Sequence, residues 1–201
     1  MTICMSDIIC VTNRKLCRED FFVRVEKIAK ANPKAIILRE KDLSESDYGA
    51  LAFEIMKICR KYDTPYILHN FVNVAVKQKE EYIHLPLSVL RKMSSDEKSR
   101  FSVIGASCHS ADDAEEAEKL GCSYITAGHI FDTECKKGLP GRGLDFLDEI
   151  CRRVTVPVYA IGGIDKGNYA DVCRAGAAGA CVMSGLMLCD DAKIYMEGFE
   201  R

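Results

Sequence analysis

The sequence predicts a single (β/α)₈ barrel, and three observations lead to this fold class. Eight short runs rich in β-branched residues alternate with stretches of helical periodicity, which is the pattern of repeated βα units. The runs are spread evenly over 201 residues, a length at the short end for a complete barrel. The unusual residues also collect just after the runs, in the loops that would line one face of a barrel. No Gly-x-Gly-x-x-Gly follows the first run, so the main sequence evidence for the alternative fold, an open dinucleotide-binding sheet, is missing.

The elements follow one another in a regular order. We expect strands over residues 7–11, 34–39, 65–69, 82–85, 101–106, 123–127, 156–161 and 179–183. Between and after them we expect helices over residues 18–31, 45–62, 72–79, 87–93, 111–120, 144–153, 168–175 and 192–199. Ser44 with Asp47, and Ser110 with Asp113, have the spacing of a helix N-cap. Glycine at positions 121 and 176 is typical of a helix end.

Composition and charge exclude several kinds of partner. The 28 basic residues nearly balance the 30 acidic residues, and neither sign is concentrated in a tail or stripe. We therefore expect neither nucleic acid nor a membrane surface as a partner. Residues 1–10 lack a basic region before an apolar run, and no stretch of about 18 uncharged apolar residues occurs. These features predict a cytoplasmic protein.

The cysteines and histidines do not form a metal-binding pattern. The cysteine count of 11 is odd, and without a secretory signal it indicates reduced thiols rather than a disulfide framework. The sequence contains no Cys-x-x-Cys pair, and its histidines, at positions 69, 84, 109 and 129, are dispersed. Structural zinc sites usually present their ligands in close pairs. We therefore expect neither a bound metal nor another cofactor.

Two glycine-containing loops follow the last two expected strands. Residues 160–164 read Ala-Ile-Gly-Gly-Ile, and residues 182–185 read Val-Met-Ser-Gly. Small residues let backbone amides approach an anion, and these two loops are the usual phosphate site of a barrel. The alternative is that Gly162 and Gly163 form a tight exit turn and that Ser184 caps a helix.

The segment after the sixth expected strand, residues 128–143, is the most unusual in the chain. Its late glycines and proline predict a long, mobile loop suited to an active-site lid. His129 lies at the base of this lid and is a candidate proton shuttle, although a lone histidine is more often structural. Lys136 and Thr133 are candidates for contact with a substrate carboxylate or phosphate.

Residues 124–142, with residues 105–110, 160–163 and 183–185, resemble the thiamin phosphate synthase superfamily. Within it, the stretch Gly-His-Ile-Phe-Asp-Thr-Glu-Cys-Lys-Lys-Gly-Leu-Pro-Gly-Arg-Gly resembles the TenI-like thiazole tautomerases. The similarity is dense from about residue 104 to residue 186. It is weaker but traceable upstream, through the Ile-Leu-Arg-Glu-Lys run of residues 37–41.

Three departures from the synthase pattern separate the two branches. Synthases have Gly-Pro where this chain has Gly128-His129, and Asn-Asp-Arg where it has residues 69–71, His-Asn-Phe. They also place an acidic pair where residues 85–89 read Leu-Pro-Leu-Ser-Val. Those acids hold the magnesium ion of a pyrophosphate substrate, because a hard divalent ion needs carboxylate oxygens. The resemblance therefore implies a tautomerase that uses His129 and no metal.

The tautomerase resemblance implies an isomerase that aromatises a dihydrothiazole carboxylate phosphate, with His129 removing and returning a proton. Gly163, Met183 and Ser184 would hold the phosphate, chiefly through backbone amides. The partner would be a small phosphorylated thiazole, and the oligomeric state, including a homo-oligomer, stays open.

Three further positions follow from the shared pattern. Arg39 and Lys41 match synthase residues that contact pyrophosphate, and here they line the entrance or are inherited scaffold. Ser107 borders the pocket, with Cys108 as lining rather than as a nucleophile.

Two rival functions remain open. The first is thiamin phosphate synthase itself, which couples a pyrimidine pyrophosphate to the thiazole phosphate. Turnover of those two substrates with magnesium would establish it. The second is a non-catalytic phosphate-binding regulatory protein, which tight ligand binding without turnover would support.

Overall fold

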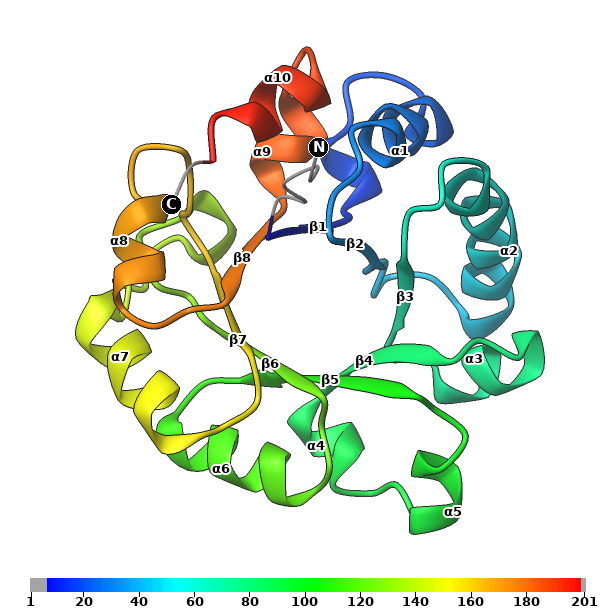
Figure 1. Ribbon diagram of the computed structural model, residues 1–201. Coiled ribbons are helices and arrows are strands. Elements are labelled where there is room, and N and C mark those ends of the chain that lie inside the picture. The colour runs from blue at the N-terminus through cyan, green and yellow to red at the C-terminus, as the bar shows by residue number, and fades with distance from the viewer. Residues whose placement is uncertain (1–6, 200–201) are drawn as a thin grey trace, which may run out of the picture.

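Eight parallel strands pair in chain order and close on themselves in the computed structural model, which describes residues 7–199 (Figure 1). Strand β1 pairs with both β2 and β8, so the sheet has no free edge. This arrangement confirms the expected (β/α)₈ barrel. The strands are β1 (Ile8–Val11), β2 (Ala35–Leu38), β3 (Tyr66–His69), β4 (Tyr82–Pro86), β5 (Val103–Cys108), β6 (Tyr124–Gly128), β7 (Val158–Ile161) and β8 (Gly179–Val182).

The helices form a ring around the strands (Figure 1). They are α1 (Phe21–Lys30), α2 (Glu45–Lys61), α3 (Val72–Gln78), α4 (Leu87–Leu90), α5 (Ser95–Lys98), α6 (Ala111–Lys119), α7 (Gly143–Arg153), α8 (Tyr169–Arg174), α9 (Ser184–Leu188) and α10 (Ala192–Glu197). Two short 3-10 helices, η1 (Arg14–Leu16) and η2 (Glu134–Lys136), lie in the loops after β1 and β6.

The barrel has two apolar layers, because successive side chains of a strand point to opposite faces. One set packs outward against the helices and includes Ile8, Cys10, Ile36 and Leu38. The other set fills the inside of the barrel: Ile9, Val11, Ala35, Ile37, Ile67, Tyr124, Tyr159 and Cys181. Both faces of a parallel sheet are thus buried, which explains why its strands read as nearly continuous apolar runs.

The helix boundaries differ from expectation in two places where polar caps decide them. Helix α1 begins three residues late because the Asp20 carboxylate accepts the amides of Phe22 and Val23. The expected helix over residues 87–93 ends early, at Leu90, and a separate short helix, α5, follows it; Ser94 with Glu97 forms the capping box that starts α5. The expected caps at Ser44 and Ser110 are confirmed, since each hydroxyl accepts the amide three residues on.

Nine cysteines have side chains that the structure describes; all nine are free thiols, and five of them are buried. Within residues 7–199, no helix is both long enough and apolar enough to cross a membrane. The expectation of a chain start without a targeting segment falls mostly on residues 1–6, outside the described residues.

Candidate active site

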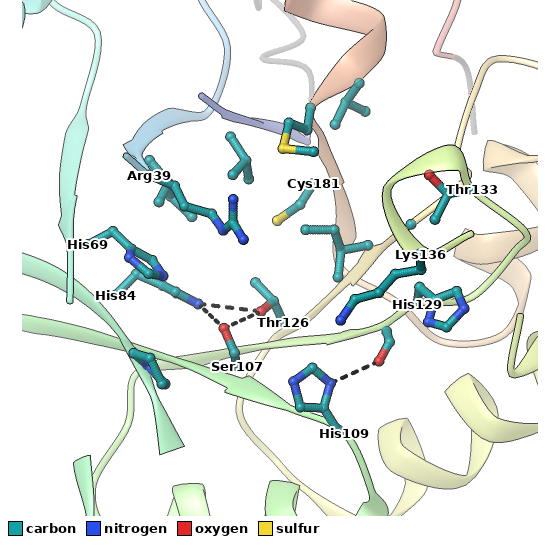
Figure 2. Close-up of a pocket in the computed structure, with 18 of the residues that line it drawn as sticks. Arg39, His69, His84, Ser107, His109, Thr126, His129, Thr133, Lys136 and Cys181 are labelled. Carbon is teal, nitrogen blue, oxygen red and sulfur yellow. Dashed lines mark hydrogen bonds between the residues drawn. The ribbon is translucent and has the colours of Figure 1, made fainter. Parts of the chain in front are cut away.

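A cavity of about 510 Å³ opens at the C-terminal ends of the strands (Figure 2). Its volume lies in the range of small-molecule sites, and this face of a barrel carries the active site in enzymes of this fold. Strand ends and the loops that follow them form its walls. The structure brings all of the candidate site residues to this one cavity: Arg39, Lys41, Ser107, His129, Thr133, Lys136, Gly163, Met183 and Ser184.

Besides Arg91, three basic side chains line this cavity, and no ion pair joins any of these three to a carboxylate of the described residues. Arg39 and Lys41 come from the loop after β2, and Lys136 comes from η2 in the loop after β6. In Figure 2, the Arg39 and Lys136 side chains both extend into the cavity. Partial burial, followed by the charges of Arg39 and Lys136, lowers the pKa of Lys41. These three residues, the cation cluster, repel one another until an anion lies between them, so the cavity favours an anionic ligand.

The loop that carries Arg39 and Lys41 is held by a buried carboxylate that the sequence did not single out. Glu40 is only 2 % exposed, and it accepts the Thr12 hydroxyl at 2.8 Å and the Arg14 guanidinium at 3.0 Å. The Thr12 hydroxyl in turn accepts the Arg39 amide at 3.0 Å. Glu40 thus points away from the cavity and holds its two basic neighbours in place. This role becomes visible only when β1 and β2 are paired, which brings Thr12 and Arg14 next to Glu40.

Among the described residues, the cavity lining includes a single carboxylate, that of Asp113. One of its oxygens lies 3.6 Å from the Arg91 guanidinium, and the other accepts the His109 amide at 3.0 Å. Residues 7–199 contain no group of three or more His, Cys, Asp or Glu side chains placed to hold a metal. Since magnesium needs carboxylate oxygens, these residues do not fit the magnesium ion that the synthase resemblance implies.

The loops after β7 and β8, the glycine loops, form the wall of the cavity between the loop after β6 and the loop after β1. Gly162 and Gly163 have φ of 101° and 67°, which disfavours any residue with a side chain. A Cβ on Gly163 would lie 2.5 Å from the Asp132 carbonyl oxygen and 2.7 Å from Phe131 Cβ. The turn therefore requires glycine for packing alone, as the alternative reading expected. Among the described residues, however, the amides of Gly163 and Ser184 and the Ser184 hydroxyl have no acceptor, so they remain available to a ligand.

The expected lid over residues 128–143 folds back on itself over the side of the cavity. The His129 Nε2–H donates to the Leu139 carbonyl at 3.2 Å, and the Arg142 amide donates to the His129 carbonyl at 3.1 Å. The Gly141 amide donates to the Asp132 carboxylate at 2.7 Å. In this arrangement His129 ties the far end of the lid to its base, and Lys136 is carried to the cavity between them.

All four histidines of the chain line the cavity, although they are dispersed in the sequence. His69 and His84 end or nearly end adjacent strands, are each 3 % exposed, and stack with ring centroids 5.9 Å apart. Burial, with the charges of His84, Lys41 and Arg39, lowers the pKa of His69 to about 2. Burial and the Lys41 charge lower the pKa of His84 to about 3. Both rings are therefore neutral near pH 7.

Strand β5 places neighbouring residues on opposite faces. The Ser107 hydroxyl faces the cavity and lies 2.8 Å from His84 Nε2. Cys108 points the other way, where its thiol lies 3.5 Å from the Asp113 carbonyl, and burial raises its pKa to about 12. The expectation that Cys108 lines the pocket is wrong, because alternation along the strand directs its side chain towards α6.

Comparison with known proteins gives a consistent family. Residues 8–186 match the model of the family described as "Thiamine monophosphate synthase". The chain is 32% identical over 193 residues to a thiamine-phosphate synthase of Fusobacterium nucleatum, covering 93% of this chain and 92% of that protein. It is 34% identical over 173 residues to that of Clostridium novyi, covering 83% of each. A solved thiamine phosphate pyrophosphorylase from Pyrococcus furiosus superposes with a TM-score of 0.81 at 27% identity, covering 96% of this chain and 93% of that one.

These relatives overturn the expected thiazole tautomerase, and with it the expected isomerase class. The curated relatives are named thiamine-phosphate synthases, which are transferases, and the similarity extends over most of the chain. The tautomerase expectation depended on local departures at Asn70, residues 85–89 and His129. That expectation treated the loss of a magnesium site as the loss of the synthase reaction. The cation cluster, however, offers another source of positive charge for a pyrophosphate.

Proposed function

Because the chain belongs to the thiamine monophosphate synthase family, we propose that it is a thiamine-phosphate synthase, a transferase that couples a pyrimidine pyrophosphate to a thiazole phosphate. The observation that carries this proposal is the cation cluster of Arg39, Lys41 and Lys136, whose charges converge on the cavity without a carboxylate partner among the described residues. A pyrophosphate supplies the negative charge that such a cluster lacks.

The cation cluster is suited to the chemical step as well as to binding. In the coupling, the carbon–oxygen bond to pyrophosphate breaks and the pyrophosphate leaves with the electron pair. A ring nitrogen of the thiazole supplies the electron pair of the new carbon–nitrogen bond. Negative charge therefore grows on the leaving group, and positive side chains already fixed beside it stabilise that charge. Glu40 and Thr12 hold the loop after β2 in this position.

The glycine loops are suited to the second substrate. Their unpaired amides at Gly163 and Ser184 match the acceptor oxygens of a single phosphate group. Met183 precedes Ser184 and contributes backbone to the same wall. The thiazole phosphate thus binds at this wall and the pyrophosphate at the cation cluster, with the reacting atoms between the two anions.

The lid serves closure rather than proton transfer in this reaction. The coupling as written moves no proton to or from carbon, so His129 has no proton to shuttle. Its bond to the Leu139 carbonyl instead keeps the lid closed, with Lys136 and Thr133 at the cavity. Closure would keep water away from the breaking bond.

Turnover of the two substrates by the purified protein tests the proposal. We expect thiamin phosphate and pyrophosphate to form in equal amounts, with both substrates required. Arg39→Ala should remove most of the rate, whereas Lys137→Ala should not, because Lys137 follows Lys136 in the lid but does not line the cavity. Binding of both substrates without any product would refute the proposed function.

A further inference from the structure

The loop after β7 is held from behind by Asn168, the residue before α8, which does not line the cavity. Its side chain makes two hydrogen bonds to the backbone of that loop. Nδ2 donates to the Gly163 carbonyl at 2.9 Å, and Oδ1 accepts the Asp165 amide at 3.0 Å. These partners fix the orientation of the side-chain amide, since a carbonyl can only accept and a backbone amide can only donate. Asn168 thus clamps residues 163–165 at both ends.

Asn168 occupies the position of a helix cap without making the bond of a cap. Asparagine is a preferred N-cap residue because its side-chain oxygen accepts an amide of the first helical turn. At α8 the Asn168 side chain makes no such bond. Asp165 serves the start of the helix instead, since its carbonyl accepts the Tyr169 amide at 3.0 Å and its carboxylate accepts the Gly167 amide at 2.7 Å. The Asn168 side chain therefore reaches back to the loop.

The bond to Gly163 fixes the direction of one peptide group. The Gly163 carbonyl and the Ile164 N–H belong to the same trans peptide, whose two polar ends point in opposite directions. With the carbonyl tied to Asn168 behind the loop, the Ile164 N–H is directed to the other side of the loop. Ile164 lines the cavity, and no carbonyl of the described residues accepts its amide. This amide is therefore a donor that the clamp holds in place.

The preceding peptide group of the loop is fixed in a different way. The Gly162 carbonyl accepts the Phe131 amide at 3.0 Å, so the Gly163 N–H points away from the base of the lid. Two successive peptide groups are thus held at their carbonyl ends, one by backbone and one by the Asn168 side chain. Only the second bond can be removed by a substitution that leaves the backbone of the loop unchanged.

We propose that Asn168 is a positioning residue, which touches no ligand and aims the Ile164 amide at the phosphate of the thiazole phosphate. This assignment rests on the proposed function, which places that phosphate at the glycine loops. A donor stabilises an anion most when it already points at the binding position before the anion arrives. Without the clamp, the peptide between Gly163 and Ile164 turns towards water, and the phosphate loses this one donor.

Replacing Asn168 by serine separates a role in the loop from a role in starting α8. Serine is as good an N-cap residue as asparagine, but its shorter side chain cannot span the Gly163 carbonyl and the Asp165 amide. Asn168→Ser should lower the affinity for the thiazole phosphate about tenfold, because a hydrogen bond to a charged group is lost. Affinity for the corresponding alcohol should change by less than about twofold. Calorimetric titration of the whole chain with both compounds measures these effects.

Kinetics and a matched control accompany the binding measurement. In the coupling reaction, Asn168→Ser should raise KM for the thiazole phosphate about tenfold and leave kcat within about twofold, as expected when only binding is lost. Asn13→Ser is the control, because the Asn13 side chain accepts the Lys15 amide in a local cap at the start of η1. This control should leave the affinity for the thiazole phosphate within about twofold. Thermal melts followed by circular dichroism show that each variant is folded.

The resonance of the Ile164 amide reports on the proposed contact directly. Titration with inorganic phosphate should shift this resonance downfield in the unmodified protein, because the N–H forms a charge-assisted hydrogen bond. In Asn168→Ser at saturating phosphate the shift of Ile164 should be lost, whereas that of the Gly163 amide should remain. A change in helix stability alone would not move these two resonances differently.

The outcomes are distinct. Unchanged affinity for the thiazole phosphate in Asn168→Ser, or an Ile164 resonance that ignores phosphate in the unmodified protein, would overturn the role of Asn168. If the serine variant fails to fold, Asn168→Asp replaces it, since aspartate keeps the bond to the Asp165 amide and cannot donate to Gly163. An Ile164 resonance that still responds in that variant would equally overturn the proposal. Absence of turnover, with phosphate binding still dependent on Asn168, would refute the coupling reaction and leave the positioning role standing.

Discussion

The two anion-binding walls of the cavity are built in opposite ways. The cation cluster carries its charge on long side chains, and its loop is fixed by the buried Glu40. The glycine loops contribute no basic side chain to the cavity lining and present backbone amides from turns that admit only glycine at position 163. Full side-chain charges suit a strongly charged group whose charge grows during reaction, and backbone amides suit a group that is only held. We therefore expect the pyrophosphate at the cation cluster and the thiazole phosphate at the glycine loops.

Loss of charge from the cation cluster should give the largest effect. Arg39→Ala should lower kcat/KM for the pyrophosphate substrate roughly hundredfold, because it removes a fixed donor from the leaving group. Affinity for the thiazole phosphate should change less than about threefold, since that group binds at the other wall. Steady-state kinetics with each substrate varied in turn measures both values. A large, equal loss for both substrates would show that the two walls are one site.

The buried histidines of the cavity, His69 and His84, should make folding sensitive to acid. The pKa of His69 is about 2 in the folded state against an ordinary value of 6.5, so the unfolded chain takes up its proton first. Stability is therefore complete above about pH 6.5, and it should fall by about 1.4 kcal/mol per pH unit for this histidine as the pH drops towards 4. Urea titrations from pH 7 to pH 4 should show a flatter dependence in His69→Phe. Parallel curves would mean that His69 titrates normally in the folded protein.

Substitutions in the glycine loops should show whether the phosphate is held by backbone amides or by a side chain. Gly163→Val should weaken thiazole phosphate binding about tenfold or more, because the side chain collides with Phe131 and Asp132 and strains the turn. Ser184→Ala should weaken it only about threefold, since one hydroxyl contact is lost. Calorimetry on both variants measures this, with circular dichroism as the folding control. Equal affinity of the unmodified protein for the phosphate and the corresponding alcohol would remove the phosphate from these loops.

Metal removal should have the smallest effect. The described part of the cavity offers basic side chains and no carboxylate cluster for magnesium. Affinity for inorganic pyrophosphate should therefore differ by less than about threefold between excess magnesium and a chelator. Calorimetric titration under the two conditions is the measurement. A strict magnesium requirement would show that the cation cluster is not sufficient to bind the anion.

The sequence predicted the barrel well because the information is local. Buried parallel strands read as short apolar runs, and each expected strand boundary lies within two residues of the observed one. Boundaries moved at Asp20 and Ser94, whose side chains cap helices but were not singled out in the sequence as those of Ser44 and Ser110 were. The 3-10 helix and the bonds that close the lid also depend on contacts that the sequence pattern does not contain.

The sequence predicted which residues lie in the candidate site but not the hydrogen bonds between them. Arg39, Lys136 and Ser184 were found because they follow strand ends. The hydrogen bonds of His84 to Tyr124 and Ser107 were missed because the three residues lie on three different strands, and only the closed sheet brings them together. Gly105, which lies beside both His84 and Tyr124 in the sheet, was a usable signal, since a glycine inside a buried strand often marks a close approach. The branch of the family was wrong because local departures were weighed above similarity along the whole chain.

A crystal structure with both inorganic pyrophosphate and the thiazole phosphate bound tests the central claim, that the cavity holds two anions at two distinct walls. The account predicts pyrophosphate oxygens in contact with Arg39, Lys41 and Lys136, and the single phosphate on the amides of Gly163 and Ser184. Both anions on the same wall, or the two in exchanged positions, would contradict it.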